Sequence, residues 1–169
     1  MSTGAPKPVL GPRLHELDLS HADGAIGQAR HFVGQVLAQW FAFAPGTSTT
    51  TTITSTNAVT DPDRTRPIQD RFIQDMLILV SEVVTNACVH TSGPLGMLVD
   101  CTPERLRIEV TDPSSVTPKP REPGPEWPGG YGLLVVQRLT RAWGSEPRGE
   151  GKAVWLEVDW PDWDLRPLQ

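Results

Sequence analysis

The sequence is poor in cysteine and has no clustered metal ligands. Its two cysteines, Cys88 and Cys101, form no Cys-x-x-Cys pair, and its four histidines are dispersed. These absences argue against a disulfide framework and against a zinc site, and they favour a reducing, cytoplasmic location. Because Cys88 falls inside an apolar helical pattern, we expect it to be a small buried residue.

Clustered positive charge is also absent. The 169 residues carry 15 Lys and Arg against 20 Asp and Glu, a net charge of −5, and the basic residues are scattered. Nucleic-acid binding depends on grouped cations, so we expect no direct nucleic-acid partner. We expect no apolar run long enough to cross a bilayer, and the N-terminus lacks the apolar region of a secretory signal, so we expect no membrane partner.

Four stretches lack helical or strand periodicity and divide the chain. Residues 1–12 are a lead-in rich in glycine and proline, and 161–169 form a tail, which leaves one domain over 13–160. Residues 44–66 are rich in threonine and predict a long loop, with a short strand at Thr50–Ile53 as the alternative. Residues 113–128 contain six prolines and predict a lid over a site.

Regular elements are predicted between these stretches. They are strands at 13–19, 95–101, 105–111, 143–145 and 152–159, and helices at 22–40, 68–90 and 132–141. Ser20 is a candidate N-cap for the first helix, and Pro67 suits the first turn of the second. The expected fold is an α+β two-layer sandwich, a mixed and mostly antiparallel sheet of about five strands with helices on one face.

The stretch Ile68–His90 is the element around which the rest is organised. Its apolar residues recur at helical spacing, and Glu82 and Asn86 lie four apart beside that stripe. In one interpretation they are a solvated helix face with a weak mutual hydrogen bond. In the other, Glu82 is a general base and Asn86 offers its oxygen to a hard cation such as Mg²⁺.

Three further motifs follow in order. Asp112 ends a strand, where it is either a turn former or a ligand group. The run Gly129-Gly130-Tyr131-Gly132 opens a helix, so its amides could face an anion, although glycine also simply permits a tight bend. The run Gly149-Glu150-Gly151-Lys152 precedes the last strand.

In this order the motifs resemble the histidine-kinase-like ATP-binding superfamily of gyrases, sensor kinases and mismatch-repair proteins, whose domain has the Bergerat fold. The phrase LVSEVVTNACVH is similar to the N-box of its anti-sigma-factor serine/threonine kinases, and GGYGLLVVQRLTRAWG to their second glycine box. The resemblance covers roughly Leu14 to Val158. The sequence departs from the family at one place. The family usually has a glycine two residues after the adenine-binding aspartate, whereas here Asp112 is followed by Pro113-Ser114-Ser115.

The resemblance implies a role for each site residue. Asn86 would hold Mg²⁺ on the nucleotide phosphates, Glu82 would activate the attacking hydroxyl, and Asp112 would accept a hydrogen bond from the adenine amino group. Gly130 and Gly132 would lie near the phosphates, and the nucleotide-binding set also includes Leu133, His90 and Lys152. For His90 a packing or capping role, and for Lys152 an exposed position, remain open alternatives.

The function that the resemblance implies is an ATP-dependent protein serine/threonine kinase. It would use Mg-ATP to phosphorylate an antagonist protein, bind a sigma factor, and pair with a second copy through its sheet. The alternative is a nucleotide-binding regulatory module that docks a partner without phosphotransfer, which the altered segment after Asp112 motivates.

Overall fold

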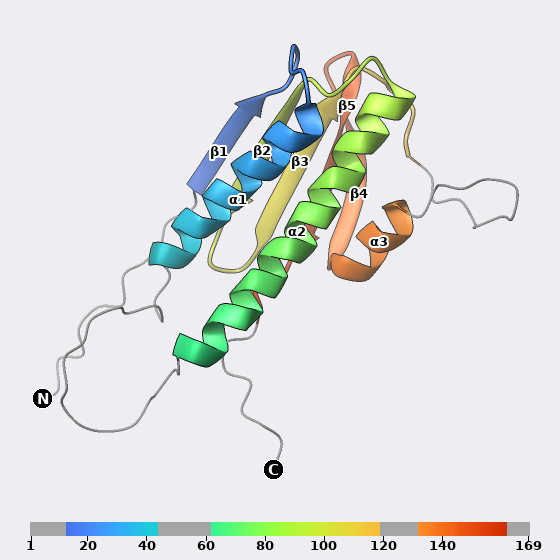
Figure 1. Ribbon diagram of the computed structural model, residues 1–169. Coiled ribbons are helices and arrows are strands. Elements are labelled where there is room, and N and C mark those ends of the chain that lie inside the picture. Colours follow the sequence, from blue (N-terminus) through green and yellow to red (C-terminus); the bar gives the residue numbers. More distant parts are fainter. Residues whose placement is uncertain (1–12, 44–61, 119–131, 162–169) are drawn as a thin grey trace, which may run out of the picture.

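One antiparallel sheet with helices on a single face makes up the domain (Figure 1). The computed structural model describes residues 13–43, 62–118 and 132–161. In these ranges the elements are β1 (Arg13–Asp18), α1 (Ala25–Phe43), α2 (Pro62–His90), β2 (Gly96–Cys101), β3 (Leu106–Asp112), α3 (Gly132–Leu139), β4 (Ala142–Arg148) and β5 (Gly151–Val158). The strand order is β1-β2-β3-β5-β4, and every described pair is antiparallel. The predicted α+β sandwich is confirmed.

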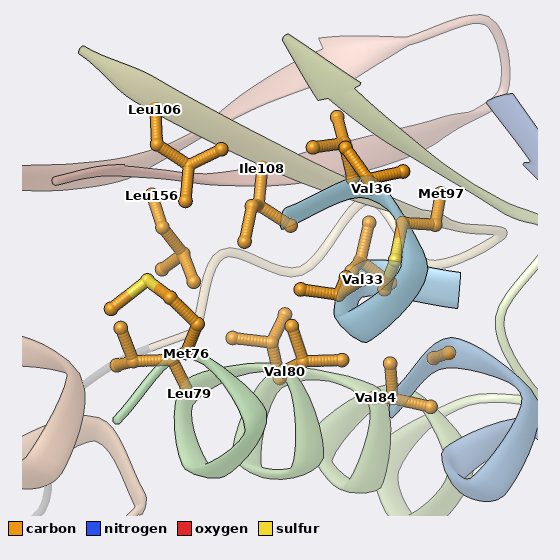
Figure 2. Close-up of a cluster of buried hydrophobic side chains, with 14 of the residues drawn as sticks. Val33, Val36, Met76, Leu79, Val80, Val84, Met97, Leu106, Ile108 and Leu156 are labelled. Carbon is orange, nitrogen blue, oxygen red and sulfur yellow. The ribbon is translucent and has the colours of Figure 1, made fainter. Parts of the chain in front are cut away.

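The core lies between this sheet and the helices (Figure 2). Alternate residues of β2, β3 and β5 face inward, as strand periodicity requires. They meet the buried faces of α1 and α2, which supply Val33, Leu37, Met76, Leu79, Val80 and Val84 among other side chains. This packing fixes α2 across the middle of the sheet.

The helix α2 is longer than predicted. It begins at Pro62 and includes Pro67, so residues 62–66 are helix rather than loop and Pro67 lies beyond the first turn. A proline at the first helical position costs no hydrogen bond, which explains why Pro62 can begin the helix. The predicted apolar stripe is confirmed as buried: Phe72, Met76, Leu79, Val80, Val83 and Ala87. The predicted stop is also confirmed, since Thr91 Oγ1 donates to the Ala87 carbonyl over 2.6 Å.

By length and composition alone the stretch Arg66–His90 could cross a membrane. The expectation that no run is long enough was therefore wrong on that criterion. In the fold, however, this stretch is the central helix, and its apolar stripe is covered by the sheet and by α1. A core helix of a globular domain passes the same test, so the finding is weak evidence for a membrane span.

The start of α1 differs from the prediction. Ser20 is not its N-cap, because its amide and hydroxyl both donate to Asp18 Oδ1, at 2.8 and 2.6 Å. The helix begins five residues later, where Gly24 adopts a left-handed φ of 74° and accepts the first helical hydrogen bond from Gln28. Glycine adopts this conformation without strain, so it takes the capping position.

The edge strand β4 is also longer than predicted, running from Ala142 to Arg148. It can include Pro147 because, among the described residues, no strand pairs with its outer side and needs the missing amide. The indole of Trp155 lies over Gly144, where a Cβ would come within 2.8 Å of the ring, and Arg107 stacks on that indole at 4.5 Å from its centroid. Trp155 is therefore on the sheet surface opposite the helices, one of its two predicted positions.

The segment that follows β5 is tied to the core. After β5, Trp160 stacks on Trp40 with ring centroids 5.0 Å apart, and its indole nitrogen donates to the Thr102 carbonyl over 2.7 Å. The predicted domain end near 160 coincides with this contact, and residues 162–169 lie outside the described ranges.

Candidate functional site

The first part of the site is the contact between α2 and α3. Gly132 is the first residue of α3, and a Cβ built there would collide with Oε2 of Glu82. The Glu82 carboxylate therefore lies at the N-terminus of α3, where helical amides have no partner within their own helix. A negative group is electrostatically favoured at that end. The structure thus brings Glu82 of the N-box motif together with Gly132, the last residue of the glycine run.

Asn86 extends this part of the site along α2. It lies one helical turn beyond Glu82 on the same side, about 6 Å along the axis, and both side chains are half-buried. The predicted border position between core and solvent is confirmed for both residues. His90, the last residue of α2, is exposed, so it is not a packing residue.

The second part of the site is a buried ion pair between β3 and β5. Asp112 and Lys152 are direct cross-strand partners, and their side chains are only 3% and 8% exposed. The Lys152 ammonium donates to Asp112 Oδ1 over 2.8 Å and to the Ser114 carbonyl over 3.1 Å. The exposed alternative for Lys152 is therefore wrong, because its ammonium is held by two acceptors inside the fold.

The segment after Asp112 is held by the same group of atoms. The Ser114 amide donates to Asp112 Oδ1 over 2.9 Å, closing a turn around Pro113. The backbone of Gly151 packs directly against this turn. A Cβ at this position would collide with the Asp112 carbonyl and come within 2.8 Å of the Pro113 Cα. Ser114 was named from the sequence only as a departure from the family pattern and this contact was not predicted, although an aspartate side chain often accepts a hydrogen bond from the backbone amide two residues later.

Both parts lie on the helix-covered side of the sheet. Asp112 continues the inward-facing series of Ile108 and Val110 along β3. The end of β3 also adjoins the end of α2, because the Leu95 amide just after that helix donates to the Thr111 carbonyl over 2.7 Å. In Figure 1, α3 lies beside α2, and β3 ends where α2 ends. A ligand could thus extend along α2 from Gly132 towards Asp112.

Two hollows that the described residues outline contain no predicted site residue. One, of about 570 Å³, lies between the β1–α1 connection and the end of α2, with Ser20, His21, Cys88 and Pro94 in its lining. The other, of about 430 Å³, lies along β1 and β2. The candidate site is instead defined by the contact of Glu82 with Gly132 and by the ion pair of Asp112 with Lys152.

A known protein family matches most of the chain. The histidine kinase-like ATPase domain matches residues 20–158. The chain belongs to the histidine kinase-like ATPase family. It therefore has an ATP-binding domain of that type, and the matched range includes every predicted site residue. No curated protein matches the chain significantly.

The other residues predicted from the sequence differ in burial within this histidine kinase-like ATPase domain. Leu133 is buried in the first turn of α3. Gly130 and residues 119–128 of the predicted lid lie outside the described residues, as do residues 44–61 of the threonine-rich stretch. Cys88 is exposed, so its predicted burial was wrong, whereas Cys101 is buried. Among the described residues no group of three His, Cys, Asp or Glu side chains could hold a metal.

Proposed function

We propose that this protein is an ATP-dependent serine/threonine kinase of the anti-sigma type, which phosphorylates an antagonist protein. The observation that carries the proposal is the position of the Glu82 carboxylate at the N-terminus of α3, beside Gly132. That helix end can receive phosphate oxygens, and a carboxylate next to bound phosphates is suited to accept a proton.

The chain's own groups have separate roles in this scheme. Free amides at the start of α3 would hold the terminal phosphates, where the absence of a side chain on Gly132 lets the backbone approach closely. Glu82 would accept the proton of the attacking serine hydroxyl. Asp112 would accept a hydrogen bond from the base. Most of the rate enhancement would come from positioning and charge stabilisation.

The residues present also fit a bound Mg²⁺. This ion is usually held by one or two protein oxygens together with substrate phosphates and water, not by a protein cage. Asn86 supplies one such oxygen, one turn from Glu82 and on the same side of α2. When bound, the ion would neutralise phosphate charge, and Asn86 would fix its position relative to Glu82.

The proposed partners follow from the resemblance of the N-box and the glycine box. They are a sigma factor and its antagonist in the cytoplasm, and a second copy of the chain that pairs through the sheet. Neither direct nucleic-acid binding nor membrane insertion is part of the proposal.

Phosphotransfer to candidate antagonists with labelled ATP tests the kinase proposal. Wild type should yield phosphoserine or phosphothreonine on one antagonist, and Glu82→Gln should lose transfer by about 100-fold or more while still binding ATP. Glutamine keeps the size of the side chain but cannot accept the proton. Failure to phosphorylate any antagonist, or full transfer by Glu82→Gln, would contradict the proposal.

A second candidate function is a nucleotide-binding module that docks a partner without transferring phosphate. It is favoured by the way Asp112 is already held by Lys152 and Ser114 and by the lack of the usual glycine after it. Calorimetry distinguishes the two: docking that responds to ATP, combined with no phosphorylated product, would support the module.

A further inference from the structure

The inward-facing cross-strand residue pairs of β3 and β5 are apolar except at one end of the two strands, where the pair is charged. Three successive pairs are apolar: Leu106 with Val158, Ile108 with Leu156, and Val110 with Val154. The fourth is the ion pair of Asp112 and Lys152, which is as buried as the apolar pairs. A buried ion pair is poor at stabilising a fold, because desolvation offsets most of the attraction, and an apolar pair in its place would often be as stable. The ammonium here thus has no evident benefit for stability.

The hydrogen bonds of this pair leave two groups for a ligand. A lysine ammonium has three donors, and Lys152 uses two of them, on Asp112 Oδ1 and on the Ser114 carbonyl. Among the described residues we find no acceptor for the third. Both hydrogen bonds that Asp112 accepts go to Oδ1, and within the same ranges none reaches Oδ2. One acceptor and one cationic donor thus lie side by side at the end of the strand pair.

The edge of a purine base is complementary to such a pair. Adenine presents the N6 amino group as a donor next to N1 as an acceptor. We propose that Lys152 is a specificity-determining residue that donates a hydrogen bond directly to N1 of the adenine ring, while Asp112 Oδ2 accepts from N6. The base is then recognised by two charged groups, and Lys152 also fixes Asp112 in one orientation. This inference rests on the proposed ATP site.

Analogues that differ by one ring atom test the proposal on the unmodified chain. Calorimetric titration would compare ATP with 1-deaza-ATP, in which a C–H group replaces N1, and with 7-deaza-ATP as the control that keeps N1 and N6. A hydrogen bond from a charged donor predicts 1-deaza-ATP binding about 10- to 100-fold weaker than ATP. 7-deaza-ATP should bind within about threefold of ATP, since Lys152 does not contact N7.

The variant Lys152→Met completes the cycle, because methionine has a similar length and no donor. It should bind ATP and 1-deaza-ATP equally. Equal binding of the two nucleotides by wild type would overturn the proposal whether or not the variant folds. Unchanged discrimination in a folded Lys152→Met would also overturn it. Discrimination without phosphotransfer would overturn only the kinase function, and no binding of ATP at all would overturn both.

Discussion

The Glu82 carboxylate and the Cα of Gly132 are so close that no side chain fits between them. They belong to different helices, separated by 50 positions in the sequence. Because the crowded Glu82 atom is the end of a flexible side chain, a new methyl group at position 132 could push it aside without disturbing the core. The contact therefore allows a test that separates chemistry from stability.

Gly132→Ala should reduce phosphotransfer by at least about tenfold, because the Cβ displaces Glu82 from the N-terminus of α3. The free energy of unfolding should change by less than about 1 kcal/mol, since alanine is favourable in a helix. The matched control is Gly34→Ala in α1, where a Cβ would meet no atom within 4 Å. It should stabilise the fold by about 0.5–1 kcal/mol and leave transfer unchanged. Equal transfer by Gly132→Ala and wild type would contradict the account.

The Asp112–Lys152 pair predicts a different pattern in chemical denaturation. Asp112→Ala alone should lower the free energy of unfolding by about 3–5 kcal/mol, because it leaves a buried ammonium without its counter-charge. The double variant Asp112→Leu with Lys152→Met should recover to within about 1 kcal/mol of wild type. It should nevertheless fail to bind ATP. A double variant that binds ATP normally would show that neither group contacts the nucleotide.

Trp160 predicts a stability effect remote from the site. Trp160→Ala should lower the free energy of unfolding by about 2–3 kcal/mol, since it removes the stacking on Trp40 and the hydrogen bond to Thr102. Trp160→Phe keeps a ring and loses the hydrogen bond, so it should cost about 1 kcal/mol. Affinity for ATP should be the same in both variants and in wild type, and a large loss of affinity would be inconsistent with the site described above.

The buried thiol of Cys101 predicts that the stability of the fold depends on pH. Burial, assisted by the nearby Asp100 carboxylate, raises the pKa of the Cys101 thiol from 9.0 to about 12. The unfolded thiol loses its proton above pH 9 while the folded one retains it, so stability should fall as the pH rises from 9 towards 12. Cys101→Ala should make the free energy of unfolding depend less steeply on pH over this range, as chemical denaturation at several pH values would measure.

The two cysteines should also differ in their reactivity. In native protein a thiol reagent should modify the exposed Cys88 and spare Cys101, and equal labelling of both would refute the burial of Cys101.

Much of the fold follows from periodicity in the sequence. The stripe of α2 and the alternation in β3 predicted their buried faces correctly, because both patterns extend over several turns or residues and leave one arrangement for the core. Boundaries were less predictable. Pro67 was interpreted as a helix start and Ser20 as an N-cap, yet α2 begins at Pro62 and Gly24 caps α1, because several residues suit a helix terminus in isolation and the surrounding contacts select one.

The candidate site was predictable in part. The order of Glu82, Asp112 and the glycine boxes predicts the family, and the match to the histidine kinase-like ATPase domain confirms the family, while the roles of these residues stay predictions. The ion pair of Asp112 with Lys152 was not, since it depends on the register of β3 against β5, which brings together residues 40 positions apart. The exposure of Cys88 was also missed, because an apolar pattern does not by itself show which side of a helix the sheet and the neighbouring helix will cover.

A crystal structure of the full chain with Mg²⁺ and a non-hydrolysable ATP analogue tests the central claim most directly. We expect the triphosphate at the start of α3 between Gly132 and Glu82, an oxygen of Asn86 on the metal, and the base against Asp112 and Lys152. A nucleotide bound elsewhere, such as in the hollow beside Ser20 and Cys88, would contradict the site and with it the kinase proposal.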